Sequence, residues 1–256
     1  MTIALAFRCA DGAVLATDSQ MTVSQLAKFP AKKLYTFGGT PANPAFAFAG
    51  REDFSRVSIS KLAEVIMRAE AHGEGLLDAL ETEAKRIHEE FHSAYEDPAE
   101  RLELGLFVAL NNKGTTELLS IFGPVVCPIA DHDFMGVGAP IARAVATPLY
   151  YPAITTVEAC RLAIYTLMQT KEFSDACGGR SQIAVICADN PFISAMLLNE
   201  DQTEQVEKVF LLFQEHLRPV LLSFYDVDEE AVFEDKLKKF SKMARKERRR
   251  LAKQFT

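Results

Sequence analysis

The sequence predicts an α+β protein, because runs that form antiparallel hairpins alternate along it with amphipathic helices. In the first hairpin, the apolar runs IALAFRC and AVLATDS flank Asp11-Gly12, a pair typical of a tight turn. In the second, LELGLFVAL and TTELLSIFG flank NNKG. Further apolar strands are predicted for AFAFAG, QIAVICAD and FISAMLL. Hairpins favour antiparallel sheets over a doubly wound parallel sheet.

Helices are predicted where apolar residues recur every three to four positions. Thr155 and Glu158 form a capping box at the start of one helix, and Pro140 suits the first turn of a shorter one. The longer predicted helices span residues 51–72, 76–95, 155–172 and 205–220.

Length and composition indicate a soluble globular protein. The 256 residues are 48% hydrophobic, enough for a sizeable core, yet no apolar run reaches the roughly 18 residues that span a bilayer. The start lacks the basic segment and cleavage pattern of a signal peptide. The five cysteines form no CxxC pair, which favours a reducing compartment. We therefore expect a cytoplasmic protein without a transmembrane segment.

The charge is distributed unevenly. Residues 236–256 carry ten Lys or Arg and one Glu, a net +9, so the other 235 residues carry −16 of the total of −7. Leu237, Phe240 and Leu251 lie on a helical stripe of this basic tail. The simplest interpretation is a helix docked on the acidic body of its own or a neighbouring subunit. Binding to nucleic acid or to an anionic membrane stays open.

Thr2 is the most informative position for chemistry. Removal of Met1, which processing favours before small residues, would leave Thr2 with a free α-amine beside its hydroxyl. An α-amine with a pKa of roughly 7.7 to 8.0 is partly neutral near pH 7. It can therefore act as the base that activates the hydroxyl for attack on a carbonyl. Taken alone, however, Met-Thr is more often an ordinary unprocessed start.

Asp18 and Lys33 are candidates to support this nucleophile. A two-residue turn in the first hairpin would pair Leu5 with Asp18, which places Asp18 about 10 Å from Thr2 along the strand. Lys33 could bridge that gap, pair with Asp18 and lower the pKa of the Thr2 hydroxyl. The alternative is a solvated hairpin end and a solvated loop lysine, which the adjacent Lys32 keeps open.

The segment TIALAFRCADGAVLATDS resembles the mature start of proteasome-type β subunits and of their bacterial ATP-dependent relatives, the N-terminal-nucleophile (Ntn) threonine peptidases. The resemblance spans roughly residues 2–200. It implies a four-layer αββα sandwich over 1–200. The resemblance does not cover the basic tail, and we expect residues 201–256 to form a helical extension that ends in this tail. The resemblance also implies homo-oligomeric rings, peptide or unfolded-protein substrates, an ATP-dependent unfoldase as partner, and no metal or organic cofactor. Its later parts are KKL at 32–34, FAG at 48–50, GVGAP at 136–140 and DACGG at 175–179.

The resemblance assigns roles position by position. Thr2 becomes the nucleophile and its amine the base, with Asp18 and Lys33 as the supporting pair. Gly50 becomes the oxyanion donor, because a glycine lets its backbone N–H approach the developing charge. Phe48 would close the base of the substrate pocket and favour small side chains.

Two segments depart from the family pattern. Val137 replaces a serine in the GVGAP turn, and the usual Asp-x-x-Ser-Gly-Gly is one residue shorter here. Alignment on the glycines puts Ser174 at the aspartate position and Cys177 at the serine, although Asp175 could serve if the loop shifts. The support of the Thr2 amine is therefore in question. Cys177 itself is better explained as a small turn residue than as a nucleophile.

Two alternatives lie outside this chemistry. HEEFH at 88–92 matches the H-E-x-x-H pattern of zinc peptidases, with His132 as the only further ligand worth naming. The charged neighbours of that motif favour a solvated helix face, so we expect no metal site. The other alternative is an inactive scaffold or binding protein on the same fold that acts through the basic tail.

Overall fold

The computed structural model describes residues 2–23, 27–38, 42–72, 75–92, 105–112, 114–188, 195–222 and 230–252. The chain forms two compact units, Met1–Thr203 and Glu204–Thr256. All the strands and the first four helices belong to the first unit.

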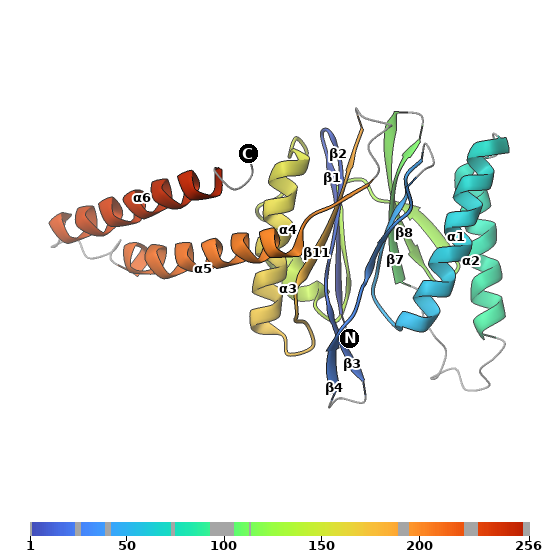
Figure 1. Ribbon diagram of the computed structural model, residues 1–256, viewed down its shortest axis with the longest axis horizontal. Helices are drawn as coiled ribbons and strands as arrows, with labels where there is room; N and C mark the ends of the chain where they lie inside the picture. The colour runs from blue at the N-terminus through green and yellow to red at the C-terminus, as the bar shows by residue number, and fades with distance from the viewer. Residues whose placement is uncertain are drawn as a thin grey trace. The chain divides into compact units, whose positions relative to one another are not determined.

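The N-terminal hairpin lies inside a five-stranded antiparallel sheet, flanked by strands from much later in the chain (Figure 1). Its strands, in spatial order, are β10 (His132–Gly136), β1 (Ile3–Cys9), β2 (Gly12–Asp18), β11 (Ser181–Cys187) and β12 (Met196–Leu197).

The register of this hairpin corrects the sequence-based pairing. Ala4 pairs with Thr17 and Cys9 with Gly12, so the turn residues are Ala10 and Asp11, and the predicted pairing of Leu5 with Asp18 is wrong. Gly12 is the first residue of β2, where it pairs with Cys9 of β1 and with Cys187 of β11. A Cβ on Gly12 would lie 1.9 Å from the Ile186 carbonyl oxygen. The new register brings Asp18 next to the start of β1.

The second predicted hairpin is confirmed, within another five-stranded antiparallel sheet. This sheet contains, in order, β5 (Leu34–Thr36), β6 (Ala45–Phe48), β7 (Gly105–Asn112), β8 (Thr115–Phe122) and β9 (Val125–Pro128). A two-stranded ribbon of β3 (Gln20–Val23) and β4 (Ala27–Pro30) leads from the first sheet toward it.

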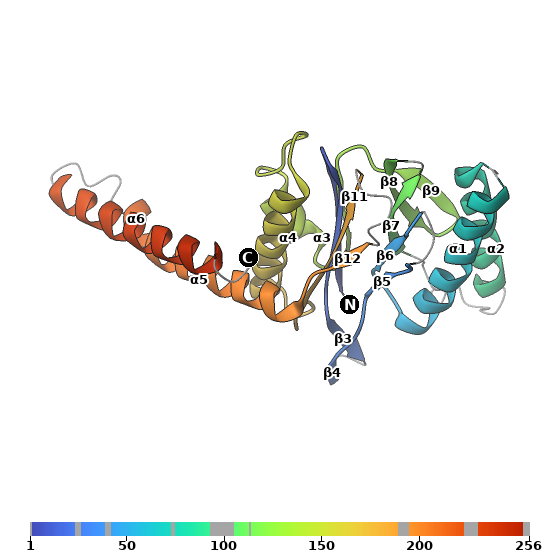
Figure 2. The same cartoon turned by 45° about the horizontal axis from the view of Figure 1, so that its top comes forward.

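The two sheets face each other, and helices cover their outer faces (Figures 1 and 2). Small residues such as Ala4, Ala6 and Ala47 fill the layer between the sheets, around Phe107. The pair α1 (Glu52–His72) and α2 (Leu76–His92) packs on the β5–β9 sheet, and α3 (Ala139–Ala146) and α4 (Thr156–Phe173) pack on the other. The α+β prediction is therefore confirmed.

The start of α4 is fixed by local chemistry and by the hairpin turn. The Thr155 hydroxyl accepts from the Glu158 backbone N–H, and the Glu158 carboxylate accepts from the Thr155 N–H at 2.9 Å, so the predicted capping box is present. Asp11 accepts from the Thr156 N–H at 2.7 Å and from its hydroxyl at 3.0 Å. These bonds tie α4 to the turn between β1 and β2.

Two helices account for the described part of the second unit. They are α5 (Glu200–Leu222), whose first turn belongs to the first unit, and α6 (Glu230–Ala252). The rings of Phe213 and Phe240 meet edge to face with centroids 6.1 Å apart. None of the described helices combines the length and the hydrophobicity that crossing a bilayer requires.

Candidate functional site

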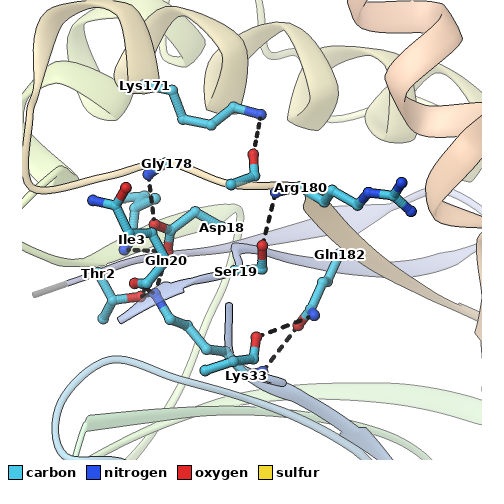
Figure 3. Close-up of polar contacts among 12 residues, drawn as sticks. Thr2, Ile3, Asp18, Ser19, Gln20, Lys33, Lys171, Gly178, Arg180 and Gln182 are labelled. Atoms are coloured by element: carbon cyan, nitrogen blue, oxygen red, sulfur yellow. Dashed lines mark hydrogen bonds and ion pairs between the residues drawn. The ribbon is translucent and has the colours of Figure 1, made fainter. Parts of the chain in front are cut away.

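Three polar side chains from separate segments converge beside the layer between the sheets (Figure 3). Thr2 directly precedes β1, Asp18 ends β2, and Lys33 directly precedes β5 of the other sheet. Thr2 is 1% exposed, and Asp18 and Lys33 are fully buried. Charged residues are almost never buried unless they are paired, so their position calls for a specific explanation.

Lys33 and Thr2 both contact the same oxygen of the Asp18 carboxylate, and they also contact each other. Lys33 Nζ lies 2.5 Å from Thr2 Oγ1 and 2.6 Å from Asp18 Oδ1, and it also donates to the backbone carbonyl of Gln20. These three acceptors match the three protons of an ammonium group. Thr2 Oγ1 in turn donates to Asp18 Oδ1 at 2.8 Å. The hydroxyl is thus held between a cation and an anion, with its proton directed at the carboxylate.

The direct contact between Thr2 and Asp18 corrects the sequence-based estimate of about 10 Å between them. That estimate followed from placing the turn at Asp11-Gly12. Because β2 starts at Gly12, Asp18 lies beside the first residues of β1 and needs no lysine to bridge the distance.

Backbone groups hold the Asp18 carboxylate in place. The Gly178 N–H donates to Oδ2 at 2.9 Å, and the Ile3 N–H approaches Oδ1 at 3.3 Å. Gly178 also packs closely on the side chain of Gln20, because a Cβ there would lie 2.4 Å from Gln20 Oε1 and would displace that side chain. The Gly178-Gly179 pair is visible in the sequence, but a glycine carries no local sign that its N–H donates to Asp18.

Gln182 of β11 holds the backbone that carries Lys33. Its Oε1 accepts from the Lys33 backbone N–H at 2.9 Å, and its Nε2 donates to the Ala31 carbonyl at 3.3 Å (Figure 3). One side-chain amide thus satisfies a donor and an acceptor two residues apart, as a neighbouring strand would. The sequence offered no signal for this role.

Burial lowers the pKa of the Lys33 amine below its ordinary value of 10.5, and the charge of Asp18 opposes that shift. Burial also raises the pKa of the Cys177 thiol, and the Asp18 charge acts in the same direction. A buried, protonated thiol is a poor nucleophile. Cys177 is 4% exposed, and its Sγ would lie 2.8 Å from a Cβ at Gly138, so it packs as a small residue beneath the GVGAP turn.

Gly50 follows β6 with a φ of 140°, in the region that favours glycine. Its neighbour Ala49 borders the start of β1. A Cβ at Gly136 would lie 3.2 Å from the Ala49 Cβ and 2.3 Å from the Thr2 carbonyl oxygen. Phe48 is fully buried and stacks on Tyr35, with ring centroids 6.4 Å apart, in the core that α1 and α2 cover.

The residues expected to support the Thr2 amine lie at the end of α4 and in the loop that follows it. Ser174 is the C-cap of α4, and its carbonyl accepts from the Cys177 N–H at 3.0 Å. Asp175 is exposed, and its backbone carbonyl accepts from Gln20 Nε2 at 3.1 Å and from Lys28 Nζ at 2.8 Å. Among the described residues, no contact of the Asp175 carboxylate with Thr2 is seen. The shortened loop is therefore held through its backbone.

The H-E-x-x-H motif lies on α2, away from the three converging residues. His88 is half-buried against the turn at Gly123, Glu89 is exposed, and the side chain of His92 falls outside the described residues. His132 lies in β10, where its Nε2 is 3.1 Å from Thr147 Oγ1. Within the described ranges, no three His, Cys, Asp or Glu side chains are grouped closely enough to hold a metal ion.

Solved structures with this architecture identify the fold. The chain matches a mutant Anbu from Hyphomicrobium sp. strain MC1 with a TM-score of 0.69 and 12% identity, over 88% of this chain and 98% of that one. The chain has the proteasome-like Anbu fold. Anbu from Yersinia bercovieri, described as an ancestral beta-subunit, matches with a TM-score of 0.68 and 12% identity, over 87% of this chain and 97% of its own.

Anbu from Pseudomonas aeruginosa, solved as a helical assembly of the Anbu complex, matches with a TM-score of 0.68 and 18% identity, over 85% of this chain and 95% of its own. At these identities the likeness to Anbu shows the fold alone. No protein-family model and no curated protein sequence matches the chain.

Proposed function

We propose that this protein is a proteasome-type threonine endopeptidase with the Ntn-hydrolase fold, in which removal of Met1 exposes Thr2 as the nucleophile. The observation that carries the proposal is the position of Lys33 Nζ, 2.5 Å from the Thr2 hydroxyl and 2.6 Å from Asp18. Moving an ion pair from water into a protein interior costs several kcal/mol per ion before pairing repays it. A strand end with no chemical task would not need this arrangement.

The geometry supports a two-step acyl transfer. Thr2 Oγ1 attacks the peptide carbonyl carbon, and its proton passes to the neutral α-amine of Thr2 directly or through water. Lys33 stabilises the developing alkoxide, and Asp18 holds Lys33 and the hydroxyl in line. The Gly50 N–H would face the oxyanion of the tetrahedral intermediate. Collapse transfers the proton to the departing amine and leaves an ester on Thr2, which water hydrolyses to a carboxylic acid.

The electrostatic role of Lys33 depends on its ammonium form, which burial disfavours because it lowers the pKa of the amine. Asp18 opposes the shift and keeps the ammonium form available for electrostatic stabilisation. Ser174, Asp175 and Cys177 would act through the backbone of their loop, which carries the Gly178 donor to Asp18.

Assembly and substrate class complete the proposal. The Pseudomonas aeruginosa Anbu complex forms a helical assembly, which supports self-association of a chain with the same fold. We propose a homo-oligomer with inward-facing sites that degrades peptides or unfolded proteins in the cytoplasm, served by an ATP-dependent unfoldase. The division into a catalytic domain at 1–200 and an extension at 201–256 belongs to the same proposal.

The test is hydrolysis of fluorogenic peptides by the purified oligomer. Thr2→Ala should abolish turnover, and Thr2→Ser should retain it, because serine keeps both the hydroxyl and the adjacent amine. Lys33→Met should lose turnover in an assembly of unchanged size. Turnover that survives Thr2→Ala would refute the proposal. Complete inactivity of the processed, assembled wild type would favour a binding protein that acts through its basic tail.

A further inference from the structure

One face of α6 is a continuous cationic surface. A shallow hollow of about 800 Å³ runs along it, and no acidic side chain lines it. We call this surface the cationic face. Its lining residues are Lys238, Ser241, Lys242, Arg245, Lys246, Arg249 and Arg250. At a rise of about 1.5 Å per residue, the face extends from Lys238 to Arg250 over roughly 18 Å of helix.

Four of its cations are free to bind a partner. Lys242, Arg245, Lys246 and Arg249 are exposed and form no ion pair with any residue that the structure describes. The other two cations of the face pair with acids of the same helix, Lys238 with Glu234 at 3.3 Å and Arg250 with Glu247 at 2.9 Å. The two ends of the cationic face are therefore partly neutralised, and the four charges between them are not compensated by acids of the same helix.

The cationic face is distinct from the face that packs within the second unit. Phe240 meets Phe213 of α5, and Phe233, Met243 and Glu247 are half-buried or buried at helical spacing from it. The apolar residues of α6 are thus on another side of the helix from the cations. A helix that only covered α5 would not require a second face made of lysine and arginine.

We propose that the cationic face binds the phosphate backbone of a nucleic acid, independently of its base sequence. Duplex DNA carries about one negative charge per 1.7 Å of axis, so a face of roughly 18 Å can engage several phosphates at once. Lysine, arginine and serine are typical phosphate contacts. The face has no aromatic, Asn or Gln side chain to stack on bases or read adenine. It also has no large apolar side chain to insert into a lipid surface.

The inference is independent of the proposed peptidase chemistry, because it concerns only α6. Fluorescence anisotropy of the full-length chain with labelled 20-base-pair duplexes of two unrelated sequences, from 50 to 200 mM NaCl, tests it. With four to six phosphate contacts, log K should fall with log salt at a slope of about −4 to −5. Both duplexes should bind equally.

Two quadruple variants each remove four positive charges, one set from the cationic face and the other from the first unit. The quadruple variant Lys242→Gln, Arg245→Gln, Lys246→Gln, Arg249→Gln should weaken binding at least 100-fold at 50 mM NaCl and flatten the salt slope to about −1. Glutamine is a good helix former, so circular dichroism should be unchanged. The control neutralises four exposed cations of the first unit, and it should bind within about threefold of wild type. Its substitutions are Arg56→Gln, Arg68→Gln, Lys85→Gln and Arg161→Gln.

Three outcomes would overturn the proposal. One is absence of duplex binding by the wild type at 50 mM NaCl. Another is equal weakening in both quadruple variants, which would make the effect one of net charge alone. The third is a defect of the α6 variant confined to phosphatidylserine vesicles or to self-association, which would identify a membrane or a second copy of the chain as the occupant.

Discussion

The buried pair of Lys33 and Asp18 makes a strong prediction for stability that does not depend on catalysis. Asp18→Asn changes little in volume but leaves the Lys33 ammonium without its counter-ion. Both side chains are fully buried and their charged atoms are 2.6 Å apart, so solvent cannot replace the lost charge. The new amide NH₂ group would also have to avoid the Lys33 ammonium and the two backbone N–H groups that now donate hydrogen bonds to Asp18.

The magnitude follows from the burial of the pair. Removing one partner of a buried ion pair lowers stability by about 3–5 kcal/mol, whereas an exposed pair contributes only about 0.2–1 kcal/mol. Lys33 keeps the Thr2 hydroxyl and the Gln20 carbonyl as acceptors, which places the expected loss at the lower end. We expect Asp18→Asn to lower the free energy of unfolding by about 3 kcal/mol, or roughly 100-fold in the folding constant.

The assay is chemical denaturation followed by circular dichroism, on both single variants and the double variant Asp18→Asn, Lys33→Met. The double variant removes both charges and should recover about 2 kcal/mol relative to the sum of the singles. Surface pair Lys61–Glu90, with side chains 25% and 49% exposed, provides the matched control and should show a coupling below about 1 kcal/mol. A loss below 1 kcal/mol for Asp18→Asn, or additive singles, would refute the reasoning.

Three further predictions follow from the same geometry. The pKa of Lys33 in the folded chain lies below its ordinary value of 10.5, so in the pH range between the folded and unfolded pKa the unfolded chain binds more protons and stability rises with pH. The free energy of unfolding of the wild type should therefore rise relative to that of Lys33→Met from pH 7 toward 10. A constant difference between the two would contradict this. Gly12→Ala places a Cβ 1.9 Å from the Ile186 carbonyl oxygen and should lower the free energy of unfolding by more than about 3 kcal/mol. Gly114→Ala lies in open space at a φ of 87° and should lower it by only about 1–2 kcal/mol. Equal losses of stability in thermal unfolding would count against the register of β1 and β2. Gln182→Leu should slow peptide turnover at least tenfold and shift its pH profile. Gln182→Glu keeps an acceptor for the Lys33 backbone N–H and should restore part of the rate. An unchanged pH profile in both variants would show that Gln182 does not position Lys33.

Local signals in the sequence were sufficient for the long elements. The α4 capping box and the β7–β8 hairpin depend on neighbouring residues, and both were predicted. The short strands β3, β4, β5 and β9 were not, because three or four residues carry no clear alternation and owe their form to pairing partners.

The site was predictable only in part, and for a physical reason. Thr2, Asp18 and Lys33 were identified from their residue types and from the family resemblance, although their register was not. The contacts that hold them come from distant parts of the chain. Gly178 contacts Asp18 across 160 residues, and Gln182 contacts Lys33 across 149. Neither has a local signature, so only the folded chain reveals them.

The measurement that tests the central claim most directly is the intact mass of the protein, expressed without an N-terminal tag, before and after treatment with a peptide epoxyketone. Such inhibitors bond to both the hydroxyl and the α-amine of an N-terminal threonine. We predict a mass that lacks Met1, a single adduct per chain, and no adduct in Thr2→Ala. A chain that retains Met1, or a processed chain that takes no adduct, would contradict the assignment of Thr2 as the nucleophile.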